Sequence, residues 1–183
     1  MEFVSEGDDR AFQELYERYS KKLFGYFLRM MKFNKVVAED ALQDVFLKIA
    51  EKPQLFKTDK SFRTWIFCIA SNYCKNYYRY EAVRLNGNAE HFSLPIGFND
   101  EFLLHAEKID RVKFDTALAK CLNELSFEKK EAFVLRYQEN KSITEISEIQ
   151  NCSDGTVKSR IHYSNKFLGE KLKAYNPNQA NHE

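Results

Sequence analysis

The sequence predicts an all-α protein made of two small helical domains joined by a flexible linker, the second containing a helix-turn-helix. Apolar residues recur every three or four positions over most of the 183 residues, which is the spacing of amphipathic helices. Only 6 glycines and 3 prolines are present, so few residues suit the tight turns of β-rich folds. The pattern lapses once, in the middle. The expected domains are residues 8–82 and 109–175, with an acidic linker over residues 83–108.

Three helices are predicted in the first domain. The first spans roughly residues 9–32 and is capped by Asp8 or Asp9, whose carboxylates accept hydrogen bonds from free amides of the first turn. The second begins after Asn34 and ends at Pro53, because proline cannot continue a helix. A loop over residues 54–60 leads to the third helix, expected from near Ser61 to about Tyr80.

Residues 84–108 lack helical periodicity and are interpreted as the linker, with a short helical turn near residues 102–105. A connection this long is unusual inside one compact domain, so it favours two domains. Helical patterns return at Ile109 and again after Ser126, which is placed to cap its helix.

The helix-turn-helix pattern lies between residues 142 and 168. Ser142 and Glu145 have the spacing of a capping box, and Ser153 is placed to cap a last helix from about residue 154 to 173. One stripe of that last helix is expected to face inward: Val157, Ile161, Ser164, Leu168 and Leu172. The opposite face carries hydroxyl and cationic groups, which suit base edges and phosphates of a DNA major groove. A solvated face of an ordinary helical hairpin would give the same pattern.

The overall charge of +1 conceals an uneven distribution. Residues 1–9 carry a net charge of −4, residues 10–80 carry +7, residues 81–116 carry −3 and residues 117–183 carry +1. Since localised charge attracts polyanions, the first domain is expected to face nucleic acid.

The third predicted helix places cations and amides among aromatic rings: Arg63, Asn72, Lys75, Asn76 and Arg79 beside Trp65, Tyr73, Tyr77 and Tyr78. This mixture suits a single strand, whose phosphates meet cations and whose unstacked bases meet rings. Trp65 and Tyr73 are expected to be core residues, so Asn72 and Asn76 are the preferred base contacts.

Several motifs resemble sigma factors of the sigma-70 superfamily. Residues 153–160, Ser-Asp-Gly-Thr-Val-Lys-Ser-Arg, resemble the opening of the recognition helix in region 4 of that family. Four stretches resemble region 2, in the same order and spacing: residues 11–16, 38–48, 61–66 and 70–79. The short length and the missing middle domain are similar to the extracytoplasmic-function (ECF) group.

This resemblance implies an RNA polymerase sigma factor that directs core polymerase to specific promoters. The second domain would recognise the −35 element as duplex, and the first would melt and capture the −10 element. The implied −35 contacts are Thr156, Lys158, Ser159, Arg160, His162, Tyr163 and Lys166. The implied −10 contacts are Lys57, Lys60, Arg63, Asn72, Lys75, Asn76 and Arg79.

The resemblance also implies partners: promoter DNA, the β′ clamp helices and β flap of core RNA polymerase, and an anti-sigma factor. The residues that match the polymerase-binding positions are Asp40, Gln43, Asp44, Phe46 and Lys48. In many relatives an aromatic residue and an arginine stand where this chain has His162 and Tyr163, so the −35 sequence stays open.

Other classes are disfavoured. No apolar stretch is long enough to span a membrane, and the acidic N-terminus does not resemble a secretory signal, so a cytoplasmic protein without membrane insertion is expected. The four cysteines and four histidines lack the spacing of metal or catalytic sites, so no enzyme, metal or cofactor is expected. Two alternatives remain: a helix-turn-helix regulator that acts without core polymerase, and a helical protein-interaction adaptor.

Overall fold

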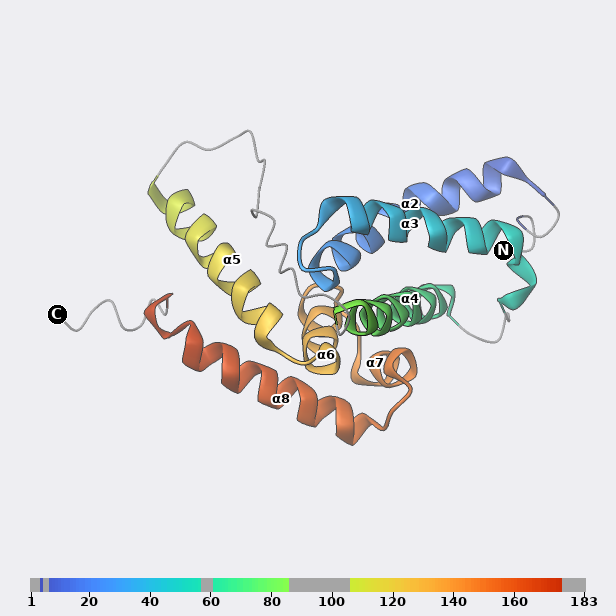
Figure 1. The fold of residues 1–183 in the computed structure, drawn as a ribbon. Coiled ribbons are helices and arrows are strands. Elements are labelled where there is room, and N and C mark those ends of the chain that lie inside the picture. Colours follow the sequence, from blue (N-terminus) through green and yellow to red (C-terminus); the bar gives the residue numbers. More distant parts are fainter. Residues whose placement is uncertain (1–3, 5–6, 57–60, 86–105, 176–183) are drawn as a thin grey trace.

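A computed structural model describes residues 4, 7–56, 61–85 and 106–175, and the regular structure within these ranges is entirely helical (Figure 1). The first domain contains α2 (Asp9–Met30), α3 (Lys35–Glu51), the 3₁₀ turn η1 (Pro53–Leu55) and α4 (Phe62–Leu85). The second contains α5 (Ala106–Glu124), α6 (Phe127–Tyr137), α7 (Ile143–Gln150), α8 (Asp154–Lys171) and the 3₁₀ turn η2 (Lys173–Tyr175). The all-α prediction is confirmed.

The predicted helix starts in the first domain hold in atomic detail. A carboxylate oxygen of Asp8 accepts from the amides of Arg10 at 2.8 Å and Ala11 at 3.2 Å. The side chain of Asn34 accepts from the amide of Val37 at 3.2 Å. These capping bonds satisfy amides that have no partner inside the helix.

Three boundaries differ from the prediction: the ends of α4 and α8, and the start of α5, which precedes the expected Ile109. Helix α4 continues past Tyr80 to Leu85, and its extra turn carries an exposed Arg84–Glu81 ion pair instead of the apolar period that marks the rest of the helix. Helix α8 ends at Lys171, so Lys173 belongs to η2. The short turn expected near residues 102–105 lies outside the described residues, and α5 begins at Ala106.

The core of the first domain forms where α2, α3 and α4 meet. Each helix contributes fully or almost fully buried side chains: Leu23, Tyr26, Phe27 and Met30 from α2; Ala41, Val45, Phe46 and Ile49 from α3; Ile66, Phe67 and Ala70 from α4. Aromatic rings pack edge to face there, and the ring centres of Tyr26 and Phe67 are 5.4 Å apart. Apolar burial of this extent is the main stabilising term for a small helical domain.

The second domain does not have a separate core. Buried residues of α6, α7 and α8 belong to the same continuous apolar cluster as the first domain: Ala132, Val134, Leu135, Ile146, Ile149, Val157 and Ile161. A smaller cluster of Cys121, Leu122 and Leu168 attaches α5 to α8. The two domains therefore pack together, with α4 lying between the α2–α3 pair and α7 (Figure 1).

Polar bonds also cross between the domains. The Tyr26 hydroxyl donates to Oε1 of Glu131 at 2.6 Å, and the Lys130 ammonium donates to the Met30 carbonyl at 3.3 Å. Because the Met30 carbonyl belongs to the last turn of α2, Lys130 caps a helix of the other domain.

Lys141 is fully buried at this interface. Its Nζ donates to the Arg63 carbonyl at 3.1 Å and to Oε1 of Glu145 at 3.3 Å, and it lies 4.7 Å from the centre of the Phe67 ring. Burial lowers the pKa of Lys141 and lowers that of Lys130 to about 7. Buried cations need such partners, and these partners require a specific docking geometry.

Candidate nucleic-acid interface

Helices α7 and α8 form the predicted helix-turn-helix. The capping box is present: the Glu145 amide donates to Oγ of Ser142 at 3.1 Å, and the Ser142 amide donates to Oε2 of Glu145 at 2.8 Å. Asn151 ends α7 in the left-handed conformation, with φ of 53°, and Ser153 starts α8 by accepting from the Thr156 amide at 3.2 Å. The turn between the helices is therefore fixed by local hydrogen bonds.

The inward stripe of α8 is confirmed at four positions, since Val157, Ile161, Ser164 and Leu168 are buried. Ser164 avoids an unpaired hydroxyl by donating to the Lys129 carbonyl at 3.0 Å. Leu172 follows the helix and is half-buried. Burial of this stripe leaves the opposite face of α8 turned to solvent.

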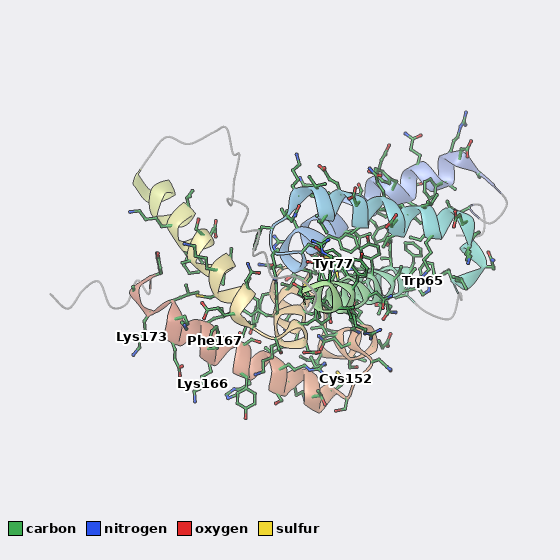
Figure 2. The ribbon with its side chains drawn as sticks, in the orientation of Figure 1. Trp65, Tyr77, Cys152, Lys166, Phe167 and Lys173 are labelled. Atoms are coloured by element: carbon green, nitrogen blue, oxygen red, sulfur yellow. The ribbon has the colours of Figure 1, made fainter. Side chains whose placement is uncertain are left out.

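Six of the seven −35 candidates lie on that exposed surface: Thr156, Lys158, Ser159, His162, Tyr163 and Lys166. Figure 2 shows Lys166 projecting from α8 away from the rest of the molecule. The Tyr163 ring is 55% exposed, with the Lys129 ammonium 5.6 Å from its centre. The face thus combines cations, hydroxyls and one aromatic ring, which can reach phosphates and base edges.

Arg160 differs from the other −35 candidates. It is half-buried at the edge of the face, and its Nη1 donates to Oε1 of Gln150 at 2.8 Å and to Sγ of Cys152 at 3.3 Å. The guanidinium is therefore held against the end of α7. Sequence periodicity gave no sign of this tether.

The exposed face of α4 carries Asn72, Asn76 and Arg79, and Nη1 of Arg79 donates to Oδ1 of Asn76 at 3.4 Å. Lys75 is half-buried on the flank. Lys57 and Lys60 lie outside the described residues, so the candidates that the structure brings together are those on α4.

The predicted core role of Trp65 and Tyr73 holds in part, because both are half-buried and pack against the apolar cluster. The Trp65 ring centre is 5.2 Å from that of Phe56. The Tyr73 hydroxyl donates to Oδ2 of Asp44 at 3.0 Å, and burial together with this bond raises the pKa of Tyr73 to about 12.

Arg63 is exposed, but its Nη2 donates to the Glu139 carbonyl of the second domain at 2.9 Å. The neighbouring flank of α4 contacts α7, where the Thr64 hydroxyl donates to Oε1 of Glu145 at 3.4 Å. The N-terminal part of α4 therefore lies in the interface between the two domains, whereas the stripe with Asn72 and Asn76 is exposed to solvent.

A cavity of about 300 Å³ lies beside the start of α4. Its walls combine the rings of Tyr19, Phe56 and Phe62 with the side chains of Leu15 and Arg18. The rings offer surfaces on which an unstacked base can stack, and the Arg18 cation in the wall is paired with the Glu14 carboxylate, which also lines the cavity. The sequence did not point to this cavity, because its walls come from α2, α4 and the segment after η1.

The outer face of α3 exposes four of the five polymerase-binding candidates: Asp40, Gln43, Asp44 and Lys48. The expectation that Phe46 belongs to this surface is corrected by its burial. It is 3% exposed, and the centre of its ring lies 4.7 Å from that of Tyr16 and 6.1 Å from that of Phe12. Helical spacing turns Phe46 to the core and its neighbour Leu47, which is 58% exposed, to solvent. Leu47 is thus an apolar residue of this face, as is Val36, which is 65% exposed on the same helical stripe.

No cluster of three or more histidine, cysteine or acidic side chains suited to a metal ion occurs among the described residues. All four cysteines are free thiols. Within the described ranges, no helix is both long enough and apolar enough to cross a membrane.

These features define a two-domain helical protein with a helix-turn-helix, and comparisons with known proteins agree. The family model for sigma-70 region 2 matches residues 15–84, and that for sigma-70 region 4 matches residues 115–164. The ECF RNA polymerase sigma-E factor of Haemophilus influenzae is 30% identical over 182 residues, covering 94% of this chain and 93% of that protein. The Escherichia coli K12 protein of the same name is also 30% identical, with 94% and 92% covered.

The chain therefore belongs to the ECF sigma factors of the sigma-70 family, which are RNA polymerase sigma factors. Two solved structures share its fold. The sigma factor RpoE of Bartonella quintana, in complex with the anti-sigma factor NepR, gives a TM-score of 0.74 at 23% identity, covering 90% of this chain and 98% of that one. CnrH, in complex with the cytosolic domain of CnrY, gives 0.66 at 24% identity, covering 93% of each chain. Members of the family are transcription initiation factors, and recognition of −35 and −10 elements is typical of them.

Proposed function

We propose that this sigma factor divides promoter recognition between α8, which reads the −35 duplex, and α4, which captures the −10 strand. The observation that carries the proposal is the pair of exposed polar faces on separate helices, one rich in cations and hydroxyls and one rich in amides. Each face suits a different form of DNA.

The α8 face suits duplex DNA. Its helix starts at a well-capped turn and presents Lys158, Ser159, His162 and Lys166 from one side of a single helix. A helix of this kind fits the major groove, where lysines meet phosphates and hydroxyl or imidazole groups meet base edges.

The α4 face suits a single strand. Asn72 and Asn76 lie one turn apart on its open stripe, so both amides can pair with the edge of an unstacked base. The cavity with Tyr19, Phe56 and Phe62 lies at the N-terminal end of α4, about 15 Å along the helix from Asn72, and offers rings on which a second unstacked base of the strand can stack. Arg79 beside Asn76 supplies a cation for a phosphate.

The α3 face suits the β′ clamp helices of core polymerase. Asp40, Gln43, Asp44 and Lys48 surround the exposed Leu47, which gives an apolar centre with a polar rim. This composition is common in protein interfaces. The second domain would bind the β flap, in line with the family.

The remaining properties follow the family and are proposed together. The protein acts in the cytoplasm and has no catalytic activity of its own. An anti-sigma factor binds it, as NepR binds the sigma factor RpoE of Bartonella quintana.

The division of labour is tested by transcription in vitro with core polymerase, the purified protein and a library of promoters. We expect initiation from a defined subset of promoters. Asn76→Ala should impair melting and leave −35 binding intact, whereas Lys166→Ala should weaken duplex binding at all sequences and lower its dependence on salt.

Lys120→Ala is a matched control for Lys166→Ala, because Lys120 is an exposed lysine of α5, a helix that contributes to neither face. A protein that neither binds core polymerase nor directs initiation would refute the proposal. Equal effects of Asn76→Ala and Lys166→Ala on melting and on duplex binding would refute the division between α4 and α8.

A further inference from the structure

A chain of four hydrogen-bonded side chains runs from the DNA-facing helix into the protein. Nη1 of Arg160 donates to Oε1 of Gln150 at 2.8 Å, and Nε2 of Gln150 donates to Oε2 of Glu131 at 3.0 Å. The other oxygen of Glu131 accepts from the Tyr26 hydroxyl at 2.6 Å. Glu131 and Tyr26 are fully buried, and Gln150 is 7% exposed. Only Arg160 reaches the surface.

The orientation of the Gln150 amide is fixed by its partners. The Glu131 carboxyl group accepts one proton of the Gln150 amide nitrogen at Oε2, so this nitrogen lies on the side of Glu131. The same nitrogen also donates to the Glu128 carbonyl at 2.9 Å, which uses its second proton. The amide oxygen must therefore face Arg160, where it accepts a hydrogen bond from Nη1 of the guanidinium.

This arrangement fixes one edge of the Arg160 guanidinium. Its Nη1 is engaged by Gln150 and by Sγ of Cys152, at 2.8 Å and 3.3 Å. A guanidinium is planar and has five N–H donors, so Nη2 and Nε remain for a phosphate or a base. A side chain already held in one rotamer loses less entropy when it binds.

We propose that Gln150 and Glu131 are positioning residues that orient Arg160 for its contact with the −35 duplex. Gln150 ends α7 of the helix-turn-helix and Glu131 lies on α6, and because both are buried they act on DNA only through Arg160. The inference rests on the proposed function, in which Arg160 contacts the −35 element. It predicts that promoter preference at the base pairs contacted by Arg160 depends on two residues that do not reach DNA.

The test uses holoenzyme reconstituted from core polymerase and the full chain, with promoters randomised across the −35 element. Sequencing of the transcripts gives the base preference at each position, and Arg160→Ala identifies the positions that Arg160 reads. In Gln150→Met, which keeps the length of the side chain but removes the acceptor, preference at those positions should fall about tenfold. Preference at the other positions should be unchanged.

Glu131→Gln is a second variant of nearly identical size. Its amide can turn a donor toward Gln150, which leaves the Glu128 carbonyl as the remaining acceptor that fixes the Gln150 nitrogen, so preference should weaken at the same positions, by less than in Gln150→Met. Glu128→Gln is the matched control, because it removes one acidic side chain from α6 while the backbone carbonyl bonded to Gln150 stays. It should leave the base preferences as in the natural protein.

The double variant Gln150→Met/Arg160→Ala should match Arg160→Ala alone, because Gln150 has nothing left to orient. Additive effects would overturn the inference, as would an equal loss at every position together with a lowered melting temperature, which a merely structural role gives. If Arg160→Ala alters preference and Gln150→Met does not, the positioning role is wrong and the proposed function stands. If Arg160→Ala alters no position while initiation continues, the Arg160 contact itself is wrong.

Discussion

At the scale of single residues, Lys130 gives the stability of the protein an unusual pH dependence. Burial, reinforced by the nearby Lys32, lowers the pKa of Lys130 to about 7 from its ordinary value of 10.5. Between these values the unfolded chain holds a proton that the folded chain has released, so stability rises with pH. From pH 7 to pH 9 the free energy of unfolding should increase by about 2 kcal/mol.

The rise should stop near pH 9. Burial raises the pKa of the Cys74 thiol above its ordinary 9.0 and that of Tyr26 well above 10.0. Above about pH 9 the unfolded chain therefore loses protons that the folded chain keeps, and the free energy of unfolding falls with pH. Urea unfolding across this range measures the effect. Lys130→Met should flatten the rise, while Lys120→Met, at an exposed site, should retain it. A rise of equal size in both variants would assign it to another group.

At the scale of elements, the capping box of α7 can be compared with a cap that lacks its side-chain bond. Ser142 bonds the Glu145 amide, whereas Ser126 starts α6 without a side-chain capping bond. Ser142→Ala should therefore destabilise the protein by about 1 kcal/mol, and Ser126→Ala should cost clearly less. Thermal or urea unfolding of the two variants gives the comparison, and equal losses would show that the capping bond is not the cause.

At the scale of the whole molecule, the shared apolar cluster predicts that the two domains unfold together. Because buried residues of α2, α3 and α4 continue into those of α6, α7 and α8, neither domain can lose its packing alone. Calorimetry of the free chain should show one transition whose calorimetric and van't Hoff enthalpies agree. Two separated transitions would contradict a joint core.

The Tyr26–Glu131 bond offers a variant for the same experiment. Tyr26→Phe keeps the ring but leaves a buried carboxylate oxygen of Glu131 without its donor, which should cost about 1–3 kcal/mol. The single transition should move to lower temperature as a whole. Movement of only part of the transition would indicate that the domains are stabilised separately.

Much of this architecture could be predicted from the sequence because it depends on local spacing. The caps at Asp8, Asn34 and Ser153 and the capping box at Ser142 involve residues two or three positions apart. The inward stripe of α8 follows from helical periodicity alone. The family resemblance, now supported by both sigma-70 family models, also came from contiguous motifs.

Other features required the tertiary structure. Helical spacing already turns Phe46 to the core side of α3, and the tertiary structure adds which rings it contacts there, those of Phe12 and Tyr16. The tether on Arg160 depends on the end of α7, ten residues away in the chain. A polar residue at a core-facing helical position, such as Glu131, was the one available signal of a buried network.

The helices, the caps at Asp8, Asn34, Ser142 and Ser153, the helix-turn-helix and the family could all be predicted from local patterns, whereas Ser126, also expected to cap a helix, makes no side-chain capping bond. The docking of the two domains was decided only in three dimensions. Tyr26 and Glu131 are 105 residues apart, and no local pattern relates them. The physical reason is that the spacing of apolar residues along a helix shows which face is buried, but not which other helix packs against that face. That choice depends on the shape and charge of both surfaces after the chain has folded.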